Sequence, residues 1–305
     1  HVTAIAGHAA RYFAFYTGVL VLRFVKKTVN FDDPGSYHFY FGDEAGSPGS
    51  ILTFFPWEHA GAGRGGVGQT QTTTFRVPAA SIGYWAQRFV EKAVKHEAPE
   101  KVFGETVLRF ADPDGMSLAL VGVPGAEQEA AWAAGEVPAA HALRGFHGVT
   151  LLLETAAPTA AILTGVLGFR QIAQEGSLTR YASGAELGGI VDIREAGGFL
   201  AGRMGRGSVH HVAFRAKDDA EQAEMSRQLI ETHHQHPTEQ KDRNYFRSIY
   251  FREPGGILFE IATDQPGFAV DEPKETLGEA LKLPRFLEPR RREIEAVLPK
   301  LGDVA

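Results

Sequence analysis

Four segments of the chain share one pattern of hydrophobic and polar positions, and each begins with a short strand-like run. The run at 210–217 alternates apolar and polar residues with period two, which is typical of a strand with one buried face, and the other three runs are similar strand-like segments. The four runs are HVTAI at residue 1, TQTTTFRV at 70, HGVTLLLE at 147 and HHVAFRAK at 210. Because successive side chains of a strand point to opposite faces of the sheet, adjacent residues in these runs are expected to differ in role.

Each opening run is followed by a stretch with helical periodicity and then by short strand-like runs separated by Gly, Asp or Pro. The predicted helices lie near residues 10–20, 81–93, 159–167 and 220–231. The turn segments ADPDG and REPGG, with an early Pro and a late Gly, predict tight hairpins between the later strands. The pattern therefore predicts an α+β protein in which a βαβββ module is used four times.

A stretch rich in Ala, Gly and Pro separates the second module from the third. This linker covers residues 123–143 and shows little periodicity. We therefore expect an N-terminal domain of two modules at 1–122 and a C-terminal domain of two modules at 144–268. The remaining tail, 269–305, has apolar spacing near 293–298, which predicts a short amphipathic helix that docks on the body or on another subunit.

The composition and charge of the chain argue against several classes of function. The 305 residues are 44% hydrophobic and 22% charged, and no apolar run approaches the roughly 20 residues of a membrane helix. The net charge of −6, without a basic stripe, argues against nucleic acid as a partner. The absence of Cys excludes disulfides and sulfur-based zinc sites and fits a cytoplasmic location. Any metal must therefore be held by His, Asp or Glu.

A single acidic residue interrupts the last strand-like run of the fourth module. In ILFEIAT, Glu260 lies among apolar neighbours, where a carboxylate is costly to bury unless it is paired or binds a metal. The corresponding residue of the second module is Ala119, and the run ILTFFPW of the first module has no acid. In the third module Asp192 is nearby, with a register uncertain by one residue. Because the repeat does not require an acid here, Glu260 is expected to have a specific role.

A histidine opens the first strand of three modules. These residues are His1, His147 and either His210 or His211, and aligning HVTAI with HVAFR pairs His211 with His1. If the first module packs against the fourth, His1, His211 and Glu260 converge on one point. Two imidazoles and one carboxylate leave open positions on an octahedral ion, a ligand set suited to non-haem Fe(II) and O2 chemistry.

The motifs VHHVAF, DRNYFRSIYFREPGG and LFEIATDQPGF make the chain similar to the vicinal oxygen chelate superfamily. More closely, it resembles the ring-cleaving dioxygenases of that superfamily that act on hydroquinones, over nearly its whole length. The resemblance implies two curved, mixed-sheet half-barrels built from four modules. It also implies that Fe(II), Mn(II) or another divalent metal is held between the first and last modules. His1, His211 and Glu260 match the ligand positions of the family.

The resemblance also implies roles for four polar residues. Arg243 and Tyr250 are expected in the substrate pocket, with His210 and Thr3 supporting the ligands. A hydroquinone bound through one oxygen loses a proton, and a guanidinium or phenol can stabilise the resulting oxyanion. His210 is then expected to relay that proton or to orient a neighbour.

The predicted activity is extradiol-type cleavage of a hydroquinone or related dihydroxylated aromatic, with insertion of both atoms of O2. A homo-oligomer is compatible with the sequence. One alternative with the same fold is a glyoxalase-like, metal-dependent lyase or isomerase. Such sites commonly present four protein ligands, and the missing acid in ILTFFPW argues against it. A non-catalytic small-molecule-binding protein is a further alternative, but it would not need Glu260 or the pair Arg243 and Tyr250.

Two other stretches are not expected to carry chemistry. The histidines of THHQHP (232–237) follow a predicted helix, where imidazoles are electrostatically favourable and usually solvated. The glycine-dense segment 61–68 lacks the strand-to-helix context of a phosphate loop and is expected to be a connector. The sequence does not decide whether His147 is a remnant of a second site in the second and third modules.

Overall fold

The chain folds into four βαβββ modules, and the computed structural model describes residues 1–301. The first module consists of β1 (Val2–Ala6), α1 (Ala9–Ala14), β2 (Arg23–Asn30), β3 (Asp33–Gly42) and β4 (Leu52–Pro56). The second consists of β5 (Gln69–Pro78), α2 (Ile82–Glu91), β6 (Glu100–Val102), β7 (Glu105–Ala111) and β8 (Ser117–Val123).

The second half of the chain repeats this order. The third module consists of β9 (Phe146–Leu153), α3 (Ala157–Gly165), β10 (Arg170–Glu175), β11 (Leu178–Ala182) and β12 (Ile190–Glu195). The fourth consists of β13 (Val209–Ala216), α4 (Asp219–Glu231), β14 (Lys241–Asp242), β15 (Arg247–Arg252) and β16 (Leu258–Thr263). The helix predicted near 10–20 is divided, because α1 is followed by a π-helical segment over Phe15–Val19.

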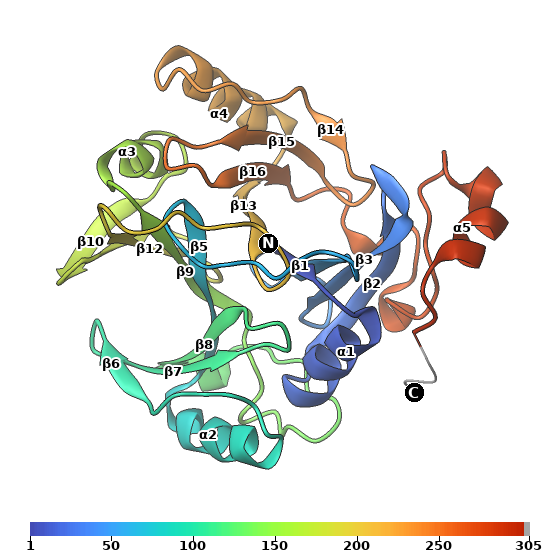
Figure 1. The fold of residues 1–305 in the computed structure, drawn as a ribbon, viewed down its shortest axis with the longest axis horizontal. Helices are drawn as coiled ribbons and strands as arrows, with labels where there is room; N and C mark the ends of the chain where they lie inside the picture. The colour runs from blue at the N-terminus through green and yellow to red at the C-terminus, as the bar shows by residue number, and fades with distance from the viewer. Residues whose placement is uncertain (302–305) are drawn as a thin grey trace.

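The two sheets do not follow the two halves of the chain. One has the strand order β14-β15-β16-β13-β1-β4-β3-β2 and joins the fourth module to the first. The other has the order β10-β11-β12-β9-β5-β8-β7-β6 and joins the third to the second. Each pair of modules meets through one antiparallel contact, β1 with β13 and β5 with β9 (Figure 1). The first and last modules therefore share a sheet, whereas the domain boundaries proposed along the sequence stay a prediction.

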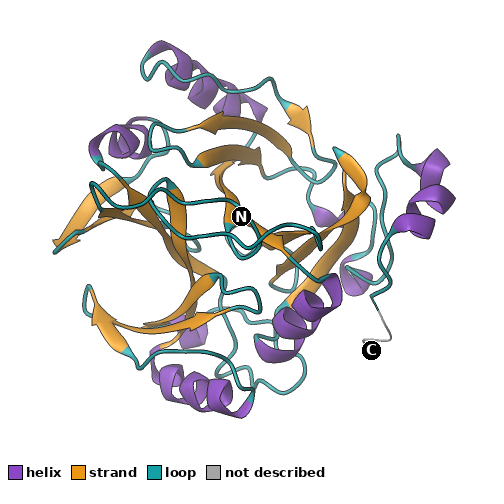
Figure 2. Ribbon diagram, viewed as in Figure 1, coloured by secondary structure: helices purple, strands orange, loops and turns teal. Residues whose placement is uncertain are grey.

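The helices lie at the periphery of the two curved sheets (Figure 2). Each buries large apolar side chains against the strands, such as Tyr12 from α1, Trp85 from α2, Ile162 from α3 and Leu229 from α4. Burying one such side chain stabilises the fold by roughly 1.5–3 kcal/mol. This arrangement confirms the predicted α+β fold of two half-barrels. Among residues 1–301, no helix combines the length and the apolar character needed to cross a membrane.

The C-terminal tail packs along the outer strands of the first module. Its helix α5 (Arg291–Val297) buries Ile294 in a small cluster with Val29 of β2, while Val297 is exposed. The tail is also anchored by Lys26 of β2, which is fully buried and whose Nζ lies 2.7 Å from Asp271 and 2.8 Å from Glu272. The tail helix therefore docks on the body of this chain.

The glycine-dense segment 61–68 is a connector between the first and second modules. It runs beside the connector that precedes β13, with isolated bridges such as Ala62 to Arg206 and Val67 to Ala201. At Gly66 a Cβ atom would lie 2.5 Å from the backbone nitrogen of Gly202. Glycine is needed here because the two backbones approach closely.

Candidate metal centre

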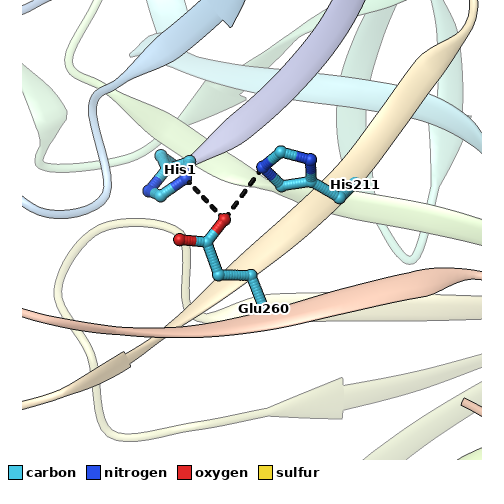
Figure 3. Close-up of side chains that lie close together, drawn as sticks. All are labelled: His1, His211 and Glu260. Carbon is cyan, nitrogen blue, oxygen red and sulfur yellow. Dashed lines mark hydrogen bonds and ion pairs between the residues drawn. The ribbon is translucent and has the colours of Figure 1, made fainter. Parts of the chain in front are cut away.

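The three predicted ligands converge where the first and last modules meet. Oε2 of Glu260 lies 2.8 Å from Nε2 of His211 and 3.2 Å from Nε2 of His1 (Figure 3). Glu260 lies in β16, His211 lies in β13, and His1 directly precedes β1, and β13 lies between β16 and β1 in the sheet. Within residues 1–301, these residues form the one group of three whose ligand atoms all lie within 4.8 Å of one another.

The protonation of this group suits a divalent cation. Burial by itself would raise the pKa of Glu260, but the imidazoles of His1 and His211 hold it well below its usual range. Burial lowers the pKa of His211 more than Glu260 raises it, which favours the neutral imidazole. Carboxylate and neutral imidazole are the forms that bind metals. The donor set thus fits a divalent metal ion with three protein ligands.

A fourth residue, Ser248, holds the carboxylate in place. Its hydroxyl donates a hydrogen bond to Oε1 of Glu260, the oxygen that faces away from the two imidazoles, and both residues are fully buried. Hydrogen bonds of this kind orient metal ligands. Sequence reasoning missed Ser248, although its position in RSIYF, two residues before Tyr250, places both side chains on one face of β15.

The two adjacent histidines of β13 line the same cavity, contrary to the expectation that they face opposite sides of the sheet. The register between β1 and β13 shifts at this point, since Thr3 lies opposite His211 and Ala4 opposite Val209. His210 is therefore an extra residue, and such a bulge redirects side chains. Nδ1 of His210 lies 2.8 Å from Nδ1 of His211, and burial lowers the pKa of His210 to about 4.

Arg243 and Tyr250 lie together at the β15 side of the ligands. Nε of Arg243 donates to the Tyr250 hydroxyl at 3.1 Å, and its Nη1 donates to Asp32 at 3.2 Å. Tyr250 is opposite Glu260 in the pairing of β15 with β16, and its ring meets that of His211 edge to face. Burial, and secondly the charge of Glu260, raise the pKa of Tyr250, so the phenol stays protonated.

All seven residues predicted from the sequence line one cavity of about 420 Å³. Aromatic rings form much of the remaining wall, including Phe55 and Trp57, which stack at 5.4 Å, and Phe246, whose ring lies 4.9 Å from that of His1. A larger cavity of about 900 Å³ also touches His1 and Phe246. It lacks Glu260, Arg243 and Tyr250, so the chemistry belongs to the smaller one.

Arg247 and Tyr245 of the same segment, DRNYFRSIYF, lie outside this cavity. Arg247 pairs with Asp219 at the start of α4, at 2.6 Å. Tyr245 is buried and donates to Asp271 of the tail at 3.0 Å. The histidines of 232–237 belong to no group of three possible metal ligands among the described residues.

In the second half-barrel an arginine lies beside His147. Nε2 of His147 lies 3.2 Å from Glu105, without the angle of a hydrogen bond, and Arg180 pairs with the same carboxylate. Arg180 also binds both carboxylate oxygens of Asp192 at 2.8 Å. By strand register the counterpart of Glu260 is Val191, one residue before Asp192. The guanidinium of Arg180 thus neutralises both Glu105 and Asp192.

Comparison with known proteins places the chain in a family. The chain is 46% identical to a Bacillus subtilis protein named as a ring-cleaving dioxygenase, MhqO, over 97% of this chain and 93% of that protein. It is 32% identical to the chlorohydroquinone/hydroquinone 1,2-dioxygenase of Sphingobium indicum, over 96% of this chain and 93% of that protein. No family model matches the chain.

Solved structures agree with this placement. A crystal structure of a Bacillus subtilis protein named as a dioxygenase has a TM-score of 0.94 at 46% identity, covering 98% of this chain and 96% of that one. Glyoxalase I from Zea mays has a TM-score of 0.66 at 13% identity, covering 87% and 91%, and shares the fold alone. The chain belongs to the ring-cleaving dioxygenases and has the vicinal oxygen chelate fold. An aromatic substrate, O2 and a divalent metal follow from this membership.

Proposed function

We propose that the protein is an Fe(II)-dependent dioxygenase that cleaves the ring of a hydroquinone or a related dihydroxylated aromatic. The observation that carries the proposal is the convergence of His1, His211 and Glu260 on one point of a cavity lined by aromatic rings. Two imidazoles and one carboxylate are the ligand set of non-haem Fe(II) sites that activate O2. The hydroquinone dioxygenase of Sphingobium indicum supports the substrate class.

When bound, Fe(II) supplies the Lewis-acid and redox chemistry by which an electron-rich ring reacts with O2. The residues of the chain bind and orient the substrate and stabilise its ionised oxygen. The stacked rings of Phe55 and Trp57 provide a flat apolar wall for an aromatic ring. This wall also excludes water, which strengthens the polar interactions in the cavity.

Arg243 and Tyr250 stabilise the oxyanion that forms when a substrate hydroxyl is ionised. The guanidinium holds the phenol oxygen of Tyr250, which leaves the phenol proton free to be donated to the substrate. Fixed donors aimed at a developing negative charge are worth most in a cavity without bulk water.

His210 is a further hydrogen-bond donor to the ionised oxygen of the substrate. Burial and the nearby His211 lower its pKa, so its imidazole is neutral and carries one proton. A His211 that binds metal through Nε2 has its proton on Nδ1 and donates it to Nδ1 of His210, so the proton of His210 lies on Nε2 and is left for the substrate. The aromatic rings of Phe55 and Trp57 meet His210 edge to face and fix its orientation.

A lyase or isomerase with four protein ligands is a weaker proposal. The counterpart of Glu260 in the first module, by strand register, is Thr53, which has no carboxylate. A cytoplasmic location, a homo-oligomeric state and the absence of nucleic acid partners also stay predictions.

The proposal is tested by anaerobic reconstitution with Fe(II), followed by oxygen uptake with a panel of hydroquinones and catechols. We expect one iron per chain and uptake with at least one hydroquinone. A Zn(II)-loaded sample serves as the control for oxidation that the enzyme does not catalyse. No uptake with any compound, despite one bound iron per chain, would contradict the proposal.

A further inference from the structure

Four polar side chains on β3, β4 and β1 form a continuous line of hydrogen bonds. The hydroxyl of Tyr40 lies 3.0 Å from Nδ1 of His38, and Nε2 of His38 lies 2.6 Å from Oγ1 of Thr53. Oγ1 of Thr53 lies 3.2 Å from Oγ1 of Thr3. Thr3, His38 and Tyr40 also line the cavity of the metal centre, so the line runs along its wall.

Strand register explains why the line ends beside the metal ligands. Tyr40 of β3 pairs with Thr53 of β4, and Thr53 pairs with Thr3 of β1. Thr3 in turn lies opposite His211 of β13. One row of residues across the sheet therefore connects Tyr40 to a metal ligand, and His38 joins it because residues two apart in a strand share a face.

Comparison of the first module with the fourth shows that Thr53 of this row occupies the position of an acid, Glu260. His1 and His211 occupy equivalent positions in their modules. The residue two positions after His1 pairs with Thr53, and the residue two positions after His211 pairs with Glu260. Thr53 is as fully buried as Glu260, and its hydroxyl faces His38 and Thr3. The first module thus has a hydrogen-bonding group where the fourth has a ligand.

The direction of the hydrogen bonds follows from the groups available. Tyr40 is almost fully buried next to the rings of Tyr245 and Phe268, and Nδ1 of His38 is its one hydrogen-bond partner among the described residues. A buried hydroxyl that does not donate is costly, so Tyr40 donates to Nδ1. Burial holds the pKa of His38 well below its usual range, so the imidazole is neutral and its proton lies on Nε2.

The direction of each remaining hydrogen bond follows from the one before it. Nε2 of His38 donates to Thr53, so the Thr53 hydroxyl has its own proton left to donate to Thr3. The oxygen of Thr3 is then an acceptor toward Thr53, and its proton points elsewhere. Thr3 lines the cavity and lies opposite His211, so that proton is available to the space where substrate binds.

We infer that His38 is a positioning residue, which acts through Thr53 to fix the hydroxyl of Thr3 as a hydrogen-bond donor to the ionised oxygen of the substrate. This inference rests on the proposed function. Arg243 and Tyr250 approach the cavity from β15 and its preceding loop, and Thr3 approaches it from β1, so the oxyanion receives donors from two strands. Without His38 and Thr53 the Thr3 hydroxyl is free to rotate, and the second donor is lost for part of the time.

The first test reads the tautomer of His38 in protein labelled with 15N at histidine, without metal or substrate. Long-range 1H–15N correlation spectra distinguish a proton on Nε2 from one on Nδ1, and the His38→Asn variant assigns the signal. We expect the proton on Nε2 in the wild type. We expect this preference to be lost in Tyr40→Phe, which removes the donor to Nδ1. A proton on Nδ1 in the wild type would overturn the inference.

The second test compares Thr53→Val, which keeps the shape of the side chain, with Thr53→Ser, which keeps the hydroxyl. We expect Thr53→Val to lower kcat by about tenfold to a hundredfold, the range expected for a hydrogen bond to a charged group, with Fe(II) affinity unchanged. We expect Thr53→Ser to retain most of the activity. Equal kcat values for Thr53→Val and the wild type, or equal losses in the two variants, would overturn the inference.

The two tests separate this inference from the proposed function. A wild type that binds iron but consumes no O2 with hydroquinones contradicts the proposed function. The tautomer of His38 is measured without iron, substrate or turnover. A wild type that is active while His38 carries its proton on Nδ1 therefore contradicts the role of His38 alone.

Discussion

His210 and His211 are neighbours in one strand, yet both line the same cavity, with their Nδ1 atoms 2.8 Å apart. The bulge opposite Thr3 makes this possible, since it inserts His210 as an extra residue. Nε2 of His211 faces Glu260, and its Nδ1 is held by His210. One imidazole thus acts as the proposed ligand, and the other orients it.

This division of roles predicts different losses of metal binding. His211→Ala removes a ligand, so we expect it to abolish stoichiometric Fe(II) binding. His210→Ala removes only the partner of a ligand, for which a loss of about tenfold to a hundredfold in affinity is typical. Anaerobic titration with Fe(II) measures both. The opposite order of the two losses would show that the ligand has been assigned to the wrong histidine.

Ser248→Ala is expected to weaken Fe(II) binding by about tenfold to a hundredfold, because the Glu260 carboxylate loses the hydrogen bond that orients it. Fe(II) titration measures the affinity, and thermal unfolding of the metal-free protein shows whether the variant is folded. Unchanged affinity in a folded variant would mean that Ser248 does not position the ligand.

Arg243→Lys is expected to lower kcat/KM by about a hundredfold to a thousandfold, because a lysine cannot hold both Tyr250 and Asp32 as the planar guanidinium does. Fe(II) affinity should not change, since Arg243 is not a ligand. Arg247→Lys is the matched control, because Arg247 pairs with Asp219 outside the cavity. Equal activity of the two variants would contradict the role of Arg243.

Thr53→Glu is expected to add a fourth ligand, because Thr53 is the counterpart of Glu260 in the first module. The metal-free variant should unfold at a lower temperature than the wild type, since it buries an additional carboxylate. Addition of a divalent metal should raise its unfolding temperature by more than it does for the wild type. Dioxygenase activity should be lost. A variant that gains no extra stabilisation from metal would contradict this equivalence of the modules.

Glu105 of the second half-barrel is expected to make the free energy of unfolding depend on pH. Burial would raise the pKa of Glu105, but His147 and Arg180 lower it to about 2. An acid with a lowered pKa stabilises the fold above its unfolded pKa, and this stability is lost as the pH falls through the folded value. Glu105→Gln should therefore reduce the free energy of unfolding at pH 7 by at most about 3 kcal/mol. The side chain is 24% exposed, so screening makes the effect smaller.

The difference between wild type and Glu105→Gln should shrink from about pH 5, be small at pH 2 and vanish below it. Denaturant unfolding across this range measures it. Glu100→Gln, which removes an exposed partner of Arg109, is the control and should show little effect at any pH. A difference for Glu105→Gln that persists undiminished at pH 2 would contradict the lowered pKa.

The fold could be predicted because each module repeats the same periodicity. Strand-like opening runs recur in all four modules, and a Pro–Gly hairpin turn such as REPGG recurs in the second and fourth, and both signals depend on local chemistry. The pairing of β1 with β13 depends on contacts between distant segments, so sequence supplied it only through the requirement that His1 meet Glu260. The π-helical segment at Phe15–Val19 has no signal that we can identify.

The proposed ligands could be predicted because Glu260 breaks an apolar run, whereas Ser248, His38 and Thr53 could not be predicted as supporting residues. His38 lies in YHFYF, where it reads as one polar residue of a half-buried strand. Its role depends on Thr53 of the neighbouring strand. The bulge that brings His210 into the cavity is likewise a property of the paired strands, and VHHVAF alone gives no sign of it.

The central claim is most directly tested by the mass of the product formed from a hydroquinone by the Fe(II)-loaded enzyme under O2. Ring cleavage by a dioxygenase predicts a product that has gained the mass of two oxygen atoms, with no release of hydrogen peroxide. Simple oxidation would instead give a quinone that has lost two hydrogen atoms. A quinone as the sole enzymatic product would contradict the account.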